Sequence, residues 1–279
     1  MYKNLCQHEF AELLKKQKEA SEKVGTPTIK SKEKRNAFIK SIENNVKLGT
    51  SVNRFHLFFN AKEGRITWSS SIEEYTGYSN RSLTLYDTLN WVHPAYYNYY
   101  TDHAIAAYQL MSETKIRKEQ YRYIIKFKLI KSDRKTIIDV MQTSTPLIFD
   151  ENGIMIAHFN EYQIIGHGET RISLSTPMMQ NKNVEVPVLK TKLANYFKGL
   201  TSINISKYKP GHIYVMGRYA DTPNITAQQM ADSGILRKNT INKYNAEIIE
   251  KTKEFLDTEI HGLYEARDIA IVYRDLGLI

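Results

Sequence analysis

The spacing of apolar residues predicts two helices at the start of the chain. Over residues 5–24 and again over 38–46, apolar side chains recur at helical intervals among Lys and Glu. Gly25-Thr26-Pro27 interrupts the first run and Gly49 ends the second. We expect residues 1–50 to form a helical segment that caps the next domain, and an arm that dimerises is the alternative.

A mixed pattern of strands and helices follows. Residues 55–59 and 65–68 predict two strands of a hairpin, and short helices follow over 72–78 and 83–89. A longer helix is predicted over 95–111, because Pro94 suits its first turn.

Three consecutive strands then complete this part of the chain. Over 121–130 the odd-numbered positions are apolar, while Arg122, Lys126 and Lys128 occupy the opposite face. Polar turns lead into strands over 135–149 and 154–165. With the first hairpin, these strands predict an α+β fold with a five-stranded antiparallel sheet and flanking helices.

The last part of the chain is predicted to be all-α. A stretch rich in Pro, Asn and Ser marks residues 169–191 as a linker before a helical domain over 192–279. In that domain Thr226 is a helix-start residue, and its helix ends near Ser233-Gly234. A short connection and a second helix follow, which is the layout of a helix-turn-helix.

The second of these helices is amphipathic. Ile241, Tyr244 and Ile248 share one face, and with Met230, Ala231 and Ile235 they form the apolar set of a small core. Lys238, Asn239, Asn242 and Asn245 lie on the other face. Asn pairs with adenine in the major groove and Lys reaches guanine or phosphate, so this face predicts contacts with DNA.

Composition agrees with a globular protein. The chain is 42% hydrophobic, contains no apolar run of membrane-spanning length, and begins without the apolar core of a secretion signal. Cys6 is its single cysteine, which excludes an intrachain disulfide and a multi-cysteine metal site. We expect a cytoplasmic protein that does not associate with membranes.

Charge supports a nucleic-acid partner only locally. The formal net charge is +9, but residues 1–50 contribute +5, residues 51–199 contribute +4, and residues 200–279 sum to zero. Within 234–246, however, Arg237, Lys238 and Lys243 stand without any acidic residue. A local patch of three cations would therefore have to meet the phosphates.

The middle of the chain resembles a PAS domain. Glu74-Tyr75-Thr76-Gly77-Tyr78-Ser79 is similar to a segment found in many PAS domains, and Trp91-Val92-His93-Pro94 is similar to the element before their long helix. The order of predicted elements also agrees over residues 51–168. The resemblance implies a sensor or dimerisation domain whose interior either holds a small ligand or is filled by its own side chains.

The C-terminal domain resembles the LuxR-type helix-turn-helix. Met230-Ala231 and Thr240-Ile241 match its two paired positions without a gap, and Gly277-Leu278-Ile279 is similar to its closing residues. Arg237 replaces the usual capping serine and Tyr244-Asn245 replaces the usual His-Arg pair, which removes one phosphate-contacting arginine. The family's opening Leu-Thr-x-Arg-Glu motif has no clear copy.

No catalytic or metal-binding motif is present. The sequence lacks a phosphate-binding Gly loop, a nucleophile motif and metal-ligand spacing, so we expect a protein that is not an enzyme. His103 lies in the predicted long helix, from which haem-binding PAS domains ligate iron. A single His among tyrosines is more often structural, so we expect no haem or other cofactor. We expect His93 to cap or hydrogen-bond locally.

The sequence therefore predicts a transcriptional regulator that binds double-stranded DNA as a homodimer and receives a small-molecule or protein signal at its PAS-like domain. The alternative is a PAS signalling module for protein–protein contacts whose helix-turn-helix no longer binds DNA. The DNA-contact residues that we expect are Arg237, Lys238, Asn239, Asn242 and Lys243. The residues that we expect around a ligand in the PAS interior are Tyr75, His103, Tyr123, Ile125 and Phe127.

Overall fold

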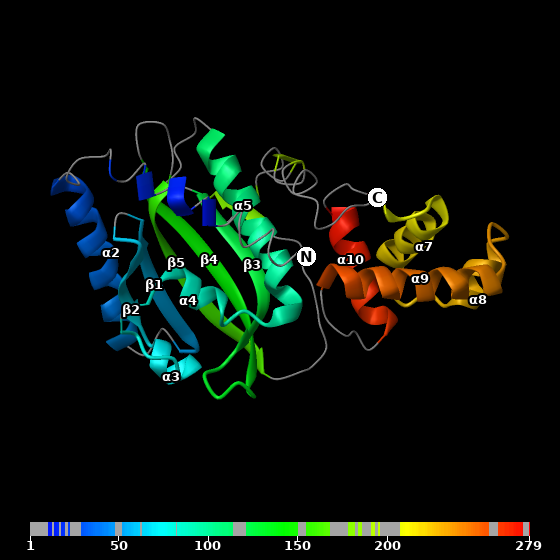
Figure 1. Cartoon of the computed structure of the whole chain (residues 1–279), viewed down its shortest axis with the longest axis horizontal. Helices are drawn as coiled ribbons and strands as arrows, with labels where there is room; N and C mark the ends of the chain where they lie inside the picture. Colours follow the sequence, from blue (N-terminus) through cyan, green and yellow to red (C-terminus); the bar gives the residue numbers. More distant parts are fainter. Residues whose placement is uncertain are drawn as a thin grey trace.

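The computed structural model confirms an α+β fold: an antiparallel sheet with flanking helices is followed by a helical part (Figure 1). It describes residues 11–12, 14–16, 18–19, 22, 29–47, 52–61, 63–81, 83–113, 121–149, 155–167, 178–181, 184–185, 191–192, 195, 207–256, 262–275 and 279. Those described between 11 and 22 are helical, and the rest of the helix predicted over 5–24 lies outside the described residues.

Seven strands of the described residues form one antiparallel sheet in the order β2-β1-β5-β4-β3-β6-β7. The five strands β1 to β5 are those that the sequence predicts. The strands are β1 (Arg54–Asn60), β2 (Arg65–Ser70), β3 (Tyr121–Ile130), β4 (Ile137–Phe149), β5 (Met155–His167), β6 (Met178–Asn181) and β7 (Val184–Glu185).

The sheet extends into the predicted linker. Residues 178–181 form β6, which pairs with β3, and β7 pairs with β6. These residues, which the sequence analysis assigns to a linker, therefore extend the sheet. Pro177 and Pro187 lie on either side of these two strands, which are too short to show a clear period.

Helices between β2 and β3 cover one face of the sheet, and α2 (Ile29–Lys47) lies along the other face (Figure 1). α2 contains the apolar run predicted to be helical over 38–46, and Ile42 anchors it in a small cluster with Phe58 and Phe159. The covering helices are α3 (Ile72–Thr76), α4 (Leu85–Leu89), η1 (Pro94–Tyr96) and α5 (Tyr97–Glu113).

The first motif of the PAS resemblance has a structural role. Gly77 ends α3 in the left-handed conformation with φ 72°, which favours glycine, and its N–H bonds to Glu73. The Tyr78 hydroxyl donates to the carbonyl of Ile130 at 3.1 Å, and the Tyr78 ring stacks on Trp91. These contacts attach α3 to the end of β3.

The second motif starts the long helical segment. The Nδ1 atom of His93 accepts a hydrogen bond from the N–H of Ala95 at 3.2 Å, and Pro94 occupies the first position of η1. The predicted capping role of His93 is confirmed. Val92 also bridges to Leu129 of β3, so the motif aligns α5 with the sheet.

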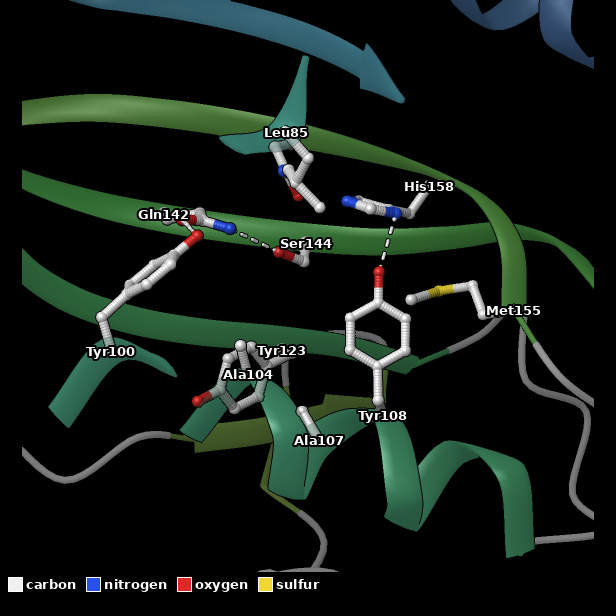
Figure 2. Close-up of a pocket in the computed structure, with 11 residues that line it drawn as sticks. Leu85, Tyr100, Ala104, Ala107, Tyr108, Tyr123, Gln142, Ser144, Met155 and His158 are labelled. Atoms are coloured by element: carbon white, nitrogen blue, oxygen red, sulfur yellow. Dashed lines mark hydrogen bonds between the residues drawn. The ribbon is translucent and has the colours of Figure 1, made fainter. Parts of the chain in front are cut away.

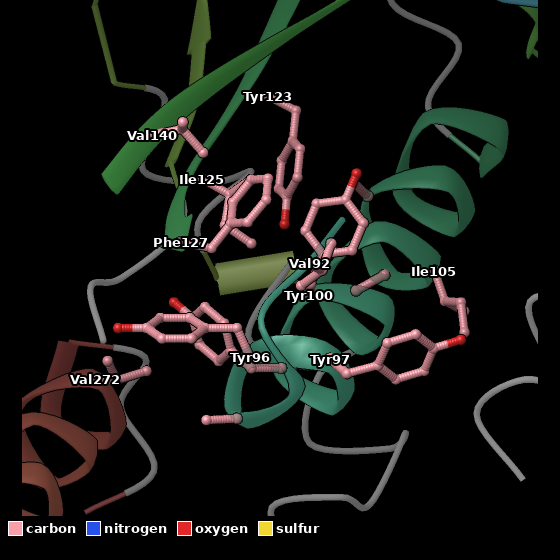
Figure 3. Packing of buried hydrophobic residues seen from close by; sticks show 14 of the residues in the cluster. Val92, Tyr96, Tyr97, Tyr100, Ile105, Tyr123, Ile125, Phe127, Val140 and Val272 are labelled. Carbon is pink, nitrogen blue, oxygen red and sulfur yellow. The ribbon is translucent and has the colours of Figure 1, made fainter. Parts of the chain in front are cut away.

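The main core lies between α5 and the sheet (Figure 3). The odd-numbered residues of β3 are buried as predicted, and Arg122 and Lys126 are exposed on the other face. Lys128 is a correction, because it is 4% exposed and pairs with Asp139 of the neighbouring strand instead of facing water. Pairing with a carboxylate compensates the ammonium for its lost hydration.

Within residues 207–256 and 262–275 the structure describes the helices α7 (Pro210–Asp221), α8 (Ala227–Asp232), α9 (Lys238–Leu256) and α10 (Leu263–Asp275). They share one core, and α9 also contacts η1 and α5 of the sheet part. Val272 of α10 belongs to the same hydrophobic cluster as Tyr96 (Figure 3). The end of α9 next to α8 lies far from the sheet (Figure 1).

Candidate functional site

The first helix of the predicted helix-turn-helix begins and ends as its sequence indicates. Thr226 caps α8, because its hydroxyl accepts a hydrogen bond from the N–H of Gln229 at 3.2 Å. The side-chain oxygen of Gln229 in turn accepts from the N–H of Thr226 at 2.8 Å. Gly234, with φ 78°, lets the chain leave the helix in the left-handed conformation. The carbonyl of Arg237 then accepts a hydrogen bond from the N–H of Ile241 at the beginning of α9.

The inner face of the motif is tightly buried. Met230 of α8 and Ile241 of α9 are both 0% exposed, and Ile248 is 1% exposed. Ile235 is a correction: it is 65% exposed in the turn, outside the small core to which its sequence position assigned it. The left-handed Gly234 redirects the chain just before it, which the helical period does not capture.

The outer face of α9 carries the predicted DNA-contact residues. All five are exposed: Arg237, Lys238, Asn239, Asn242 and Lys243. Asn245 is a correction, because it turns inward and its Oδ1 accepts from the hydroxyl of Tyr219 at 3.0 Å. The exposed polar face of α9 thus has one Asn fewer than predicted, and it lies on the first turns of the helix.

A second candidate site is a cavity of about 40 Å³ between α5 and the sheet (Figure 2). By this measure one water molecule needs roughly 10–15 Å³, so there is room for more than one water or for a small ligand. Eleven residues line the cavity: Leu85, Tyr100, Ala104, Ala107, Tyr108, Tyr123, Gln142, Ser144, Met155, His158 and Asn160.

Hydrogen bonds join the polar side chains of this lining to one another. The Tyr100 hydroxyl donates to Oε1 of Gln142 at 3.0 Å, and Nε2 of Gln142 donates to Ser144 at 2.8 Å. Tyr108 and Nδ1 of His158 are 3.2 Å apart (Figure 2). Each strand residue in these contacts comes from β4 or β5, and each tyrosine comes from α5.

The described part of the cavity lining is electrically neutral. Among the described residues that line the cavity there is no Asp, Glu, Lys or Arg. Burial lowers the pKa of His158 to about 4, and burial raises the pKa of Tyr100 to about 12, so both are uncharged near neutral pH. A charged ligand would meet no counter-ion here.

One of the five predicted ligand residues, Tyr123, lines the cavity. Ile125 and Phe127 are buried on the same strand but pack in the core, where Phe127 lies 4.7 Å from the Tyr100 ring. The Tyr75 hydroxyl accepts from the N–H of Asn53 at 3.0 Å, away from the cavity. Alternation along β3 identifies the inward face but not the place where side chains leave a space.

His103 is fully buried but does not line the cavity. Its ring meets the ring of Tyr99 edge-on at 4.6 Å, and burial lowers its pKa well below the ordinary value. Among the described residues, no group of three or more His, Cys, Asp or Glu is arranged to hold a metal ion. None of the helices in the described ranges combines the length and apolar character of a membrane span.

Sequence reasoning missed the other cavity residues. Small residues at 104 and 107 on α5 leave the space, and β4 and β5 supply the amide, imidazole and Ser hydroxyl groups. Two Ala residues three positions apart, between Tyr100 and Tyr108, are the signal that could have located it, since they put a gap on the sheet-facing side of the helix.

Comparison with known proteins gives weak similarities only. No family model and no curated protein matches the chain. Among solved structures, a phage VqmA in complex with DPO is 12% identical, with 81% of this chain and 88% of that chain covered and a TM-score of 0.32. VqmA of Vibrio cholera in complex with ligand and DNA is 11% identical, with coverages of 82% and 88% and a TM-score of 0.29. Similarities this low do not establish a shared function.

Proposed function

We propose that this protein is a DNA-binding transcriptional regulator that acts as a homodimer and whose PAS-like domain responds to a small neutral molecule. One observation carries the proposal: the polar tips of α9 are exposed while the opposite face of the same helix is buried against α7 and α8. A helix that is held firmly on one side and presents Asn and Lys on the other is suited to the major groove.

Each exposed residue has a distinct role in the proposed complex. Asn239 and Asn242 offer a donor and an acceptor on one amide, which matches the exposed edge of adenine. Arg237 and Lys238 stand at the start of α9, where the first backbone N–H groups also favour phosphate. Lys243 reaches guanine or phosphate. With a homodimer, two copies of α9 would read half-sites in successive major grooves.

The alternative, a signalling module that no longer touches DNA, makes a different demand on α9. It requires the Lys238–Asn245 face to pack against the PAS-like domain or a dimer partner in every state. Lys238, Asn239 and Asn242 are exposed, and this end of α9 lies away from the sheet (Figure 1). These features favour the DNA-binding function.

The cavity supports the sensory half of the proposal. Its lining offers amide, hydroxyl and imidazole groups but no charge, so we propose a small neutral ligand with hydrogen-bonding groups. Replacing Ala107 with Leu would fill the space from α5. We expect Ala107→Leu to lose any small molecule that native mass spectrometry detects on the wild type, and retention of that molecule would contradict the assignment.

DNA binding is tested by selecting duplexes from a random pool with the purified full-length protein. We expect enrichment of related sequences with two half-sites, and footprints that shift when Asn242 is replaced by Ala. A pool that stays random after repeated rounds would contradict DNA recognition.

A further inference from the structure

The start of α7 fits closely against the middle of α9. A Cβ atom on Gly211 would lie 2.4 Å from the Cε2 atom of Tyr244, so the missing side chain at this position leaves the room that the Tyr244 ring occupies. The His212 ring meets the Tyr244 ring edge-on at 5.0 Å. Tyr244 lies two residues after Asn242, so this contact fixes the part of α9 that carries the DNA-contact residues.

His212 is held in one tautomer. Its Nδ1 accepts from the backbone N–H of Lys209 at 3.2 Å, which caps the start of α7. The ring proton therefore belongs on Nε2, which donates to Oε2 of Glu247 at 2.7 Å. His212 is 0% exposed and the Glu247 side chain is 28% exposed, so water reaches this bond only from the side of the carboxylate.

Glu247 joins three basic side chains. Besides His212, its Oε2 lies 3.1 Å from Nζ of Lys209, and its Oε1 lies 3.9 Å from Nζ of Lys243. Hydrogen bonds from Lys209 and His212 hold the pKa of Glu247 below its ordinary value. The carboxylate is thus ionised near neutral pH and ties α9 to α7.

We propose that Glu247 is a positioning residue for DNA recognition: by accepting the hydrogen bond of His212, it fixes the rotation of α9 about its own axis and so the direction in which Asn242 faces. This inference rests on the proposed function. Rotation matters because a bidentate base contact tolerates little misplacement, whereas contacts of Lys and Arg with phosphate tolerate much more. Loss of the bond should lower sequence discrimination and leave non-specific affinity in place.

Two conservative variants separate the effect of the position of the Glu247 carboxylate from the effect of its charge. Glu247→Asp keeps the charge but withdraws the carboxylate from His212 by one methylene group. Glu247→Gln removes the charge but keeps an oxygen at the same distance. The dissociation constants of both variants and of wild type are measured with two DNA duplexes. One is the duplex that wild type selects from a random pool, and the other is a shuffled duplex of the same composition. The readout is the ratio of the two dissociation constants, with thermal unfolding measured in parallel.

We expect Glu247→Asp to reduce the ratio about tenfold, the effect of one impaired base contact, and Glu247→Gln to stay within about threefold of wild type. An unchanged ratio in Glu247→Asp would overturn the positioning role. The positioning role would also be overturned if Glu247→Gln reduced the ratio as much as Glu247→Asp or more. The charge of the side chain would then matter more than the position of its oxygen. If wild type itself selects no duplex, the proposed function fails before this test begins.

Discussion

The sheet part and the helical part place their polar side chains in opposite ways. Around the cavity, Gln142, His158 and Asn160 are each about 4% exposed or less and point into the protein. On α9, Asn239 and Asn242 point out to solvent. Polar groups set in a cavity can recognise only a molecule small enough to enter, whereas an exposed polar helix can meet a large surface such as DNA.

The same contrast appears within α9 over a single residue step. Ile241 is 0% exposed, and the next residue, Asn242, is exposed. One helix therefore supplies both the core of the helical part and its proposed recognition surface. Disturbing the two faces separately should give unequal effects on stability and binding.

The largest effect on stability is expected from Ile241→Ala. Deleting a buried Ile side chain leaves a cavity, so the free energy of unfolding should fall by about 2–5 kcal/mol. The neighbouring Asn242→Ala is the matched control and should change it by less than about 0.5 kcal/mol. Urea unfolding of both variants tests this, and similar losses in the two would refute the assignment of inner and outer faces.

A smaller effect is expected from the buried imidazole of the cavity. Burial lowers the pKa of His158 from 6.5 to about 4, so the unfolded chain binds a proton that the folded chain refuses between these values. Above pH 6.5 His158 is neutral in both states and its contribution to the free energy of unfolding is complete. As the pH falls below 6.5 this contribution is lost, because the unfolded chain binds the proton. At pH 5 the loss relative to pH 7 should be about 2 kcal/mol.

His158→Gln should remove this part of the pH dependence. His103 is also buried with a lowered pKa, so the quantity to compare is the difference between wild type and variant. His167 is exposed at the end of β5, and His167→Gln serves as the control. Parallel stability curves for wild type and His158→Gln from pH 7 to pH 5 would show that His158 is not buried in its neutral form.

The smallest of the three effects is expected from the cap of α8. Thr226→Ala removes a hydroxyl that accepts from the N–H of Gln229, which should cost about 1 kcal/mol. Thr226→Ser keeps the acceptor and should cost less. Thermal unfolding of the pair measures the cap, and equal midpoints for Ala and Ser would contradict its role.

The sequence predicted the parts of the fold that depend on local patterns. Alternation located β3, and the cap at Thr226 and the left-handed Gly234 located the limits of α8. Tertiary contacts decided the remainder. Asn245 turned inward because Tyr219 of another helix accommodates it, and Lys128 is buried because Asp139 of the adjacent strand pairs with it. The cavity also depends on how α5 packs against β4 and β5, which a linear pattern does not contain.

The central claim, that the exposed face of α9 binds DNA, is tested most directly by a salt titration of DNA affinity. Asn242→Ala/Lys243→Ala is compared with wild type and with Lys40→Ala/Asn44→Ala, which makes the same chemical change at exposed positions of α2. We predict that the α9 variant binds more weakly and has a shallower dependence of affinity on salt, by about one phosphate contact, while the α2 variant matches wild type. Equal affinities and equal salt slopes for all three proteins would contradict the account.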